Sequence, residues 1–121
     1  MAKHPDIHIK RIYEKPASSD GYRILVDRIW PRGIKKEDAQ LDEWDKSLAP
    51  SSALRKWFNH QQERFDEFEK KYEAELMREK DELIRVKKIG ESQKVTLLYG
   101  ARDTEMNQAV VLARVLRNLR R

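Results

Sequence analysis

The chain has 121 residues, of which 39% are charged and 8% aromatic, and its formal net charge is +5. A chain of this length is expected to form a single domain, residues 1–121, around one core. It contains no cysteine, which excludes disulfides, a thiol nucleophile and cysteine-based zinc or iron–sulfur sites. No apolar run has the length of a signal peptide or of a membrane span of roughly 20 residues, so we expect a cytoplasmic protein that makes no membrane contact.

The charge is unevenly distributed along the chain. Residues 63–82 contain nine acidic and five basic residues, a net charge of −4, so the remainder has a net charge of +9. A basic surface favours encounters with phosphate-bearing ligands or nucleic acid, but it does not identify a reaction.

The N-terminal third predicts two strands. Apolar and polar residues alternate from Ile7 to Tyr13, which indicates a first strand. Glu14 to Gly21 is a loop rich in turn-forming residues. At eight residues the loop is short for a helical crossover, so loop length alone favours antiparallel pairing of the first two strands.

The stretch from Tyr22 to Gly33 predicts a buried strand that ends at Asp27, followed by a rigid loop. Pro31 lacks an amide proton and favours an extended conformation at the residue before it, while Gly33 allows a positive φ. This loop places several polar or aromatic side chains beyond the end of the strand, namely Asp27, Arg28, Trp30 and Arg32.

The middle of the chain predicts mainly helices. Lys35 to Gln40 fits a short helical turn, and Leu41 to Ala49 fits a short strand or an extended segment. Pro50-Ser51-Ser52 is typical of a helix start, here for a helix that ends at Phe58. An amphipathic helix follows from Gln61, with Phe65, Phe68, Tyr72 and Leu76 at helical spacing, and continues after a break near Glu79 to a stop at Gly90.

The C-terminal part predicts a second buried strand over Lys94–Tyr99 and a final helix capped by Asp103 or Thr104. Strands that alternate with helices indicate an α/β fold. We expect a small, mainly parallel sheet flanked by helices in a three-layer, α/β/α-like arrangement.

Both buried strands end in charged residues, which predicts a site. Parallel strands open onto one edge of a sheet, where ligands of α/β proteins bind. The first turn of the final helix adds partial positive charge. We therefore expect an anion pocket formed by Arg28, Arg32 and Arg102, with Asp27 or Tyr99 as the group that transfers a proton if the site is catalytic.

Alternative interpretations remain open. Asp27 and Asp103 can instead pair with Arg28 and Arg102 to hold the loops, and Asp103 can cap the helix. Trp30 and Trp57 fit the core or a pocket wall, and His60 fits either an acid–base role or the surface. Four arginines near the C-terminus fit phosphate contacts or stabilisation of the helix dipole, namely Arg114, Arg117, Arg120 and Arg121.

We expect no metal and no cofactor. No pair of histidine, aspartate or glutamate residues has a recognisable ligand spacing on a predicted rigid element. The sequence also lacks a phosphate-binding glycine loop and a nucleophile elbow.

Several motifs resemble one family. They are Lys10-Arg11-Ile12-Tyr13, residues 20–33, Leu48-Ala49-Pro50-Ser51, Leu54-Arg55-Lys56-Trp57-Phe58 and Thr96-Leu97-Leu98-Tyr99 with Ala101-Arg102-Asp103 and Asn107. Over nearly the whole chain they resemble the YeaO-like branch of the domain-of-unknown-function 488 family, a group of small cytoplasmic α/β proteins without an established activity. The resemblance implies that the first two strands are parallel. It also implies shared motif positions at Asp27, Arg28, Arg32, Ser51, Arg55, Trp57, Tyr99, Arg102, Asp103 and Asn107.

This chain departs from the broader family at two places. Many members resemble an arrangement with a cysteine after the last buried strand and a Cys-His-Arg triplet at the start of the final helix. Here the corresponding residues are Tyr99 and Asn107-Gln108-Ala109. Thiol or metal chemistry of those relatives does not transfer to this chain.

The sequence leaves two functions to be weighed. The first is a pocket for a small anionic ligand bearing phosphate or carboxylate, in an enzyme or in a binding protein. The second is a nucleic-acid-binding module that uses the basic surface and stacks bases on Trp30 or Trp57. Neither the substrate nor the oligomeric state follows from the sequence.

Overall fold

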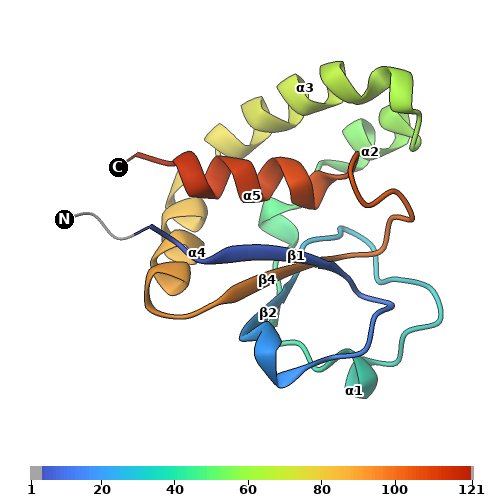
Figure 1. The fold of residues 1–121 in the computed structure, drawn as a ribbon. Coiled ribbons are helices and arrows are strands. Elements are labelled where there is room, and N and C mark those ends of the chain that lie inside the picture. The colour runs from blue at the N-terminus through green and yellow to red at the C-terminus, as the bar shows by residue number, and fades with distance from the viewer. Residues whose placement is uncertain (1–3, 121) are drawn as a thin grey trace.

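The computed structural model describes residues 4–120, and a four-stranded sheet lies at its centre. The strand order is β1-β4-β2-β3, and every neighbouring pair is parallel. The strands are β1 (Ile7–Arg11), β2 (Tyr22–Leu25), β3 (Glu43–Trp44) and β4 (Val95–Tyr99), as Figure 1 shows. The small α/β fold with a parallel sheet that the sequence predicts is confirmed.

The helices cover the two faces of the sheet unequally. Those of the described chain are α1 (Lys36–Ala39), α2 (Ser52–Phe58), α3 (Phe65–Met77), α4 (Lys80–Ser92) and α5 (Gln108–Asn118). The four longer helices, α2 to α5, lie on one face, and the short α1 lies on the other (Figure 1). The layer opposite the main helices is therefore thin and consists largely of loops.

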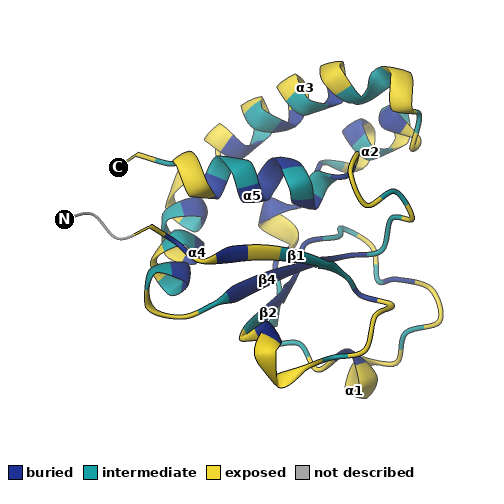
Figure 2. Cartoon of the chain, in the orientation of Figure 1, coloured by how far each residue is buried: buried dark blue, intermediate teal, exposed yellow. Residues whose placement is uncertain are grey.

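Each face of the sheet has its own apolar cluster. The main core packs Phe68 and Tyr72 of α3 against alternate residues of β2 and β4, including Ile24 and Leu97. The smaller cluster, on the α1 side, contains Ile12, Leu25, Ala39 and Leu98, with Trp30 and Trp44 packed against it. β4 is buried along its whole length because it is covered on both faces (Figure 2).

The first two strands do not pair with each other. β4 lies between β1 and β2 and runs parallel to both. The antiparallel pairing expected from loop length is therefore wrong, and the parallel direction implied by the family resemblance is right. The loop that joins them contains a short 3-10 turn over Ser18–Asp20.

Gly21 allows β2 to approach β4 closely. Its φ is +68°, and a Cβ at this position would lie 2.3 Å from the backbone oxygen of Lys94. The next residue, Tyr22, donates its backbone N–H to that same oxygen at 2.8 Å. A glycine is thus required where the β2–β4 pairing begins.

A buried ion pair anchors the loops on the α1 side of the sheet. Arg23 of β2 donates to Asp20 at 2.6 Å and to the backbone oxygens of Ala39 and Gln40 at 2.7 and 3.1 Å. Lys10 of β1 also donates to Asp20 at 3.0 Å. Burial acts to raise the pKa of Asp20, but hydrogen bonds from the Ala17 backbone, Lys10 and Arg23 together lower it.

Two predicted helix boundaries are wrong. α4 continues through Gly90 to Ser92. Gly90 is helical and packs against the N-terminal segment, where an added Cβ would lie 2.7 Å from Ile7 Cδ1. α5 is capped by Asn107, whose Oδ1 accepts the backbone N–H of Val110 at 3.0 Å, and not by Asp103 or Thr104. None of the helices within residues 4–120 combines the length and apolarity needed to cross a membrane.

Candidate functional site

A pocket of about 430 Å³ lies beyond the carboxyl ends of β2 and β4. Its walls come from the loop after β2, from α2, from Gly100 and Ala101 after β4, and from the start of α5. Five of the residues predicted as site residues line it: Asp27, Arg28, Arg32, Arg55 and Asn107. The edge of the sheet that the sequence indicates is therefore hollowed.

Asp27 is the only acidic residue among those that line the pocket. Its Oδ2 accepts the backbone N–H of Gly100 at 2.9 Å, and its Oδ1 accepts a short hydrogen bond from Nε2 of Gln108. Burial raises the pKa of Asp27 to about 6, against the lowering effect of these hydrogen bonds and of the Arg55 charge. Asp27 is thus a carboxylate that takes up a proton near neutral pH.

Arg28 lines the pocket but is bound to backbone carbonyls. Its Nε donates to the oxygen of Pro50 at 2.7 Å, and its Nη2 lies 3.3 Å and 3.4 Å from the oxygens of Lys46 and Ala49. These bonds hold the segment before α2 against the end of β2. Because carbonyl oxygens are neutral, the positive charge of Arg28 is not cancelled by them.

Arg55 is the least satisfied side chain of the pocket. Within residues 4–120 its guanidinium donates no hydrogen bond and forms no ion pair, and its buried Nε has no partner. α2 positions this residue, and Ser51 begins α2 by accepting the N–H of Leu54 at 3.1 Å. The positive charge of Arg55 lowers the pKa of Asp27.

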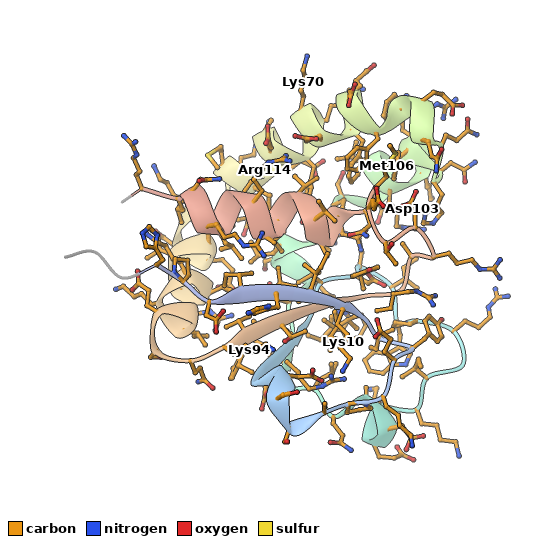
Figure 3. All side chains as sticks on the ribbon, in the orientation of Figure 1. Lys10, Lys70, Lys94, Asp103, Met106 and Arg114 are labelled. Atoms are coloured by element: carbon orange, nitrogen blue, oxygen red, sulfur yellow. The ribbon has the colours of Figure 1, made fainter. Side chains whose placement is uncertain are left out.

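The two aspartate–arginine pairs weighed from the sequence are not formed in the described structure. Asp27 is bound by Gly100 and Gln108, and Arg28 by carbonyl oxygens. Asp103 accepts the backbone N–H groups of Glu105 and Met106, each at 2.9 Å, in the turn before α5 (Figure 3). These bonds, together with one from Gln62, lower the pKa of Asp103.

Five predicted site residues do not line the pocket: Asp103, described above, and Tyr99, Arg102, Ser51 and Trp57. Tyr99 is 2% exposed and packs in the main core, and burial raises its pKa. Arg102 is exposed. Ser51 caps α2 and donates to Glu75 of α3 through its Oγ at 2.6 Å and its backbone N–H at 2.8 Å. Trp57 packs at the core margin, with the Nζ of Lys71 4.2 Å from a ring centroid. The arginine that joins Arg28 and Arg32 at the pocket is thus Arg55, where the sequence interpretation expected Arg102.

Some pocket residues are absent from the predicted set, namely Tyr13, Ile29, Gln108, Phe58, Phe68 and His60. Gln108 belongs to the Asn107-Gln108-Ala109 triplet singled out in the sequence, but its bond to Asp27 depends on the start of α5 reaching the end of β2. His60 and the preceding Asn59 have left-handed backbones, with φ values of 56° and 46°. Two consecutive left-handed residues after a helix turn the chain sharply. In the sequence, the Asn-His pair that interrupts the helix was the feature that could have indicated this turn.

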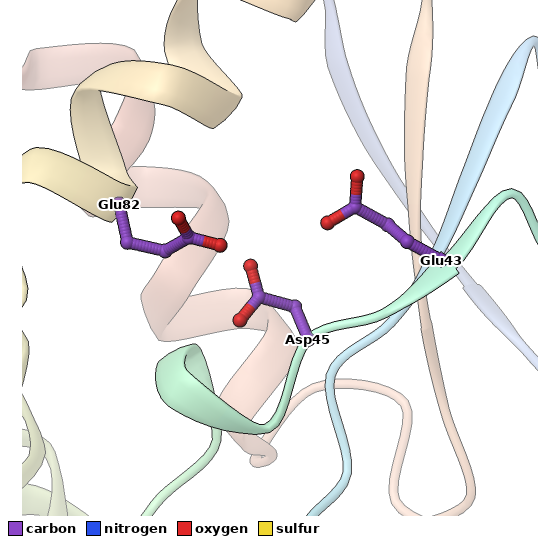
Figure 4. A group of neighbouring side chains, drawn as sticks. All are labelled: Glu43, Asp45 and Glu82. Carbon is purple, nitrogen blue, oxygen red and sulfur yellow. The ribbon is translucent and has the colours of Figure 1, made fainter.

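A separate carboxylate cluster lies between β3 and α4. Glu43, Asp45 and Glu82 have ligand atoms within 4.8 Å of one another (Figure 4). Arg85 offsets part of this charge, because it bonds Glu43 at 3.1 Å, Glu82 at 2.7 Å and Asp45 at 3.4 Å. Burial and the neighbouring Glu82 raise the pKa of Asp45, whereas Arg85 lowers that of Glu82. The cluster therefore connects β3 to α4, with Arg85 offsetting part of its negative charge.

The C-terminal arginines are largely occupied by contacts within the chain. Arg114 lies on α5 and pairs with Glu69 and Glu73 of α3 (Figure 3). Arg117 donates to the backbone oxygen of Ile7. Arg121 lies outside the described residues. Of the two alternatives for these arginines, a phosphate-binding stripe is therefore interrupted at Arg114 and Arg117.

Comparison with known proteins identifies the relatives of this chain. A family model described as "Inactive DUF488-N3 subclade" matches residues 6–120. The "Uncharacterized protein YeaO" of Escherichia coli (strain K12) is 50% identical over 114 residues, which cover 94% of this chain and 99% of that protein. The "Uncharacterized protein Rv3073c" of Mycobacterium tuberculosis (strain ATCC 25618 / H37Rv) is 40% identical over 116 residues, 96% of this chain and 98% of that protein. No solved structure gives a significant match.

The family model and the bacterial relatives agree with the motifs described above. The match extends across the strands, the pocket loops and α5, so it includes every residue assigned to the pocket. On these grounds the chain belongs to the DUF488 family, in its YeaO-like branch.

Proposed function

We propose that this protein binds a small anionic ligand, bearing phosphate or carboxylate, in the pocket at the carboxyl ends of β2 and β4. The observation that carries the proposal is the unsatisfied guanidinium of Arg55, whose Nε is buried without a partner in the described chain. A buried donor without an acceptor costs about 1–3 kcal/mol, and more when it is charged. An anion would supply the missing acceptors in charge-assisted hydrogen bonds.

The charges around Arg55 support the same proposal. Arg28 and Arg32 also line the pocket, and neither forms an ion pair within residues 4–120. Asp27 is the single acid among the lining residues, and its two oxygens already accept hydrogen bonds. The start of α5 adds the positive end of a helix dipole at Asn107 and Gln108. The pocket therefore has an excess of positive charge.

Binding without turnover fits this pocket better than catalysis. Of the two groups considered for proton transfer, Tyr99 is buried in the core and does not line the pocket. Asp27 is held by Gly100 and Gln108. The matching family model carries the word "inactive" in its description, which agrees with a role in binding. A cytoplasmic location stays a prediction.

The proposal is tested by titrating sulfate and phosphate into the full chain by calorimetry, with Arg55→Gln and Arg102→Gln compared to the wild type. Arg55→Gln should raise the dissociation constant at least about tenfold, the equivalent of one charged hydrogen bond. Arg102→Gln is the matched control, because Arg102 is exposed and does not line the pocket, and it should leave the constant nearly unchanged.

The unfolding of the anion-free variants distinguishes a binding role from a structural one. Because Arg55 donates no hydrogen bond to the described chain, Arg55→Gln should leave the free energy of unfolding without anion unchanged or higher. If the variant is destabilised, or if it binds sulfate and phosphate as well as the wild type does, the proposal is wrong.

The nucleic-acid alternative finds less support in the described contacts. Trp30 packs edge-on against Trp44, with ring centroids 5.2 Å apart, and donates its Nε1 proton to the oxygen of Ile34. Trp57 is covered by Arg64 and Lys71. Both rings therefore already have partners within the chain, and Trp30 lies in the pocket lining. Salt-sensitive binding of DNA or RNA that survives Arg55→Gln would favour this alternative over the anion pocket.

A further inference from the structure

The size of the pocket exceeds what a simple anion needs. Its volume is about 430 Å³. A phosphate ion displaces roughly two or three waters, which is about 60–90 Å³. Pockets that hold whole small molecules measure about 300–1,000 Å³. The pocket therefore has room for an anion together with an organic body of considerable size.

The uncharged part of the lining is apolar and partly aromatic. Phe58, Phe68, Pro31 and Pro50 contribute to the walls. Four large apolar side chains are conspicuously exposed in the described chain, and two of them, Tyr13 (45%) and Ile29 (55%), line this pocket. Exposed apolar groups beside a charged hollow mark a surface that a ligand covers.

The ring of Tyr13 is held in place at the pocket. Its hydroxyl donates to the backbone oxygen of Arg32 at 2.8 Å, and the Arg11 guanidinium lies over the ring, 4.9 Å from its centroid. Arg11 is itself fixed by a 2.9 Å bond to the oxygen of Ala101. A ring immobilised in this way can stack against a flat ligand with little loss of side-chain entropy.

Gln108 adds polar groups beside this apolar wall. One N–H of its amide donates to Asp27, and its carbonyl oxygen accepts no hydrogen bond from residues 4–120. A primary amide that presents both an acceptor and a second donor pairs well with the polar edge of a heterocycle.

From these observations we infer that the ligand is a free nucleoside monophosphate or a similar ring-bearing phosphate, with its phosphate at Arg55 and Arg28 and its ring against Tyr13 and Ile29. This inference rests on the proposed anion pocket. Two guanidinium groups from separate elements suit a doubly charged phosphate better than a carboxylate, which one planar fork satisfies.

The test compares four probes on the full chain by calorimetry: inorganic phosphate, ribose 5-phosphate, the common nucleoside monophosphates and the corresponding nucleosides without phosphate. At least one nucleoside monophosphate should bind about tenfold or more tightly than ribose 5-phosphate. If ribose 5-phosphate and inorganic phosphate bind as tightly as every nucleotide, the ring is not recognised and the inference is overturned, while the anion pocket stands.

Two variants locate the ring. Ile29→Ser should lower the affinity for the nucleotide about three- to tenfold and leave that for inorganic phosphate unchanged. Met77→Ser is the matched control, since Met77 is similarly exposed (49%) and lies outside this pocket, and it should change neither affinity. Equal effects of the two variants would overturn the placement of the ring.

The remaining outcomes separate the inference from the proposed function. If no phosphate-bearing probe binds, both fail. If the nucleosides bind as tightly as the nucleotides and Arg55→Gln has no effect, the anion pocket fails. If a 5′-phosphorylated oligonucleotide binds more tightly than any mononucleotide, the inference that the ligand is a free nucleotide is overturned.

Discussion

At the scale of single residues, Asp27 and Arg55 bring opposite charges to one pocket, and they differ in how those charges are satisfied. Asp27 accepts hydrogen bonds from Gly100 and Gln108, whereas Arg55 donates none within the described chain. Protonation of Asp27 removes the one negative charge that an incoming anion meets among the lining side chains. Anion binding is therefore expected to depend on the protonation state of this carboxyl.

Sulfate should bind more tightly as the pH falls through 6, the pKa to which burial raises Asp27. Sulfate keeps its charge over this range, so only the protein titrates. From pH 7.5 to pH 5 we expect a roughly tenfold gain in affinity, because a nearby like charge is removed. In Asp27→Asn the affinity should be independent of pH, as measured by calorimetry at several pH values.

His60 is the necessary control for this experiment, because it is the one histidine among the lining residues. The other charged groups of the lining are Arg28, Arg32 and Arg55, which keep their charge throughout. His60→Gln should preserve the pH dependence. If it abolishes the dependence while Asp27→Asn retains it, the histidine is the titrating group.

The sequence located part of the pocket lining, for identifiable reasons. Asp27, Arg28 and Arg32 are local to a strand end, and the Pro-Gly loop that presents them is readable from residue type. Arg55 entered only through the family resemblance, because nothing in a short amphipathic helix shows which side chain faces a distant strand. Arg102 was misplaced because its position one residue before Asp103 does not determine the direction of its side chain.

At the scale of the elements, α2 depends on Ser51 for its start and for its attachment to α3. Ser51 caps the helix through Leu54 and binds Glu75 through both its hydroxyl and its backbone N–H. Ser51→Ala should lower the free energy of unfolding by about 1–2 kcal/mol, through loss of the cap and of one hydrogen bond. Urea denaturation measures this change.

Ser52 provides the comparison for Ser51, because it is the exposed first residue of the same helix. Ser52→Ala should change the free energy of unfolding by less than about 0.5 kcal/mol. Equal losses in the two variants would mean that the bond to Glu75 and the cap contribute little.

The pairing of β2 with β4 depends on Gly21. Gly21→Ala should destabilise the protein by about 2–4 kcal/mol, since its Cβ would clash with a backbone oxygen at 2.3 Å and the residue also needs a positive φ. Gly33→Ala isolates the second effect, because Gly33 has a φ of +81° but nothing within 4 Å of the added atom. We expect a loss of only about 1 kcal/mol there, measured by thermal or urea unfolding.

If Gly33→Ala were as destabilising as Gly21→Ala, the backbone conformation alone would explain both losses. The close approach of β2 to the oxygen of Lys94 would then have no separate energetic role.

At the scale of the whole molecule, the alternation of strands and helices predicted the α/β class correctly. Helical spacing of Phe68, Tyr72 and Leu76 identified α3, and apolar runs identified β2 and β4. The strand order was not predictable, because it depends on pairings such as Ile7 with Val95 that are distant in sequence. Gly90 was misassigned as a helix end for a similar reason, since the contact that requires glycine comes from the N-terminal segment.

The sheet order predicts that a fragment of residues 1–93 does not fold. β1 pairs with β4 alone, and β2 pairs with β4 and with the two-residue β3, so removal of β4 leaves β1 without a neighbour. We expect circular dichroism to show residual helix without a cooperative thermal transition. A cooperative transition in the fragment would mean that the helices form a core independently of the central strand.

The late position of β4 also shapes what happens while a ribosome makes this protein. At about 5–20 residues per second, the segment that becomes β1 waits roughly 4–18 seconds for its partner to be synthesised. During that interval the backbone N–H and C=O groups of β1 and β2 lack the β4 groups with which they pair. The nascent polypeptide is thus expected to depend on shielding by chaperones until its last quarter leaves the exit tunnel.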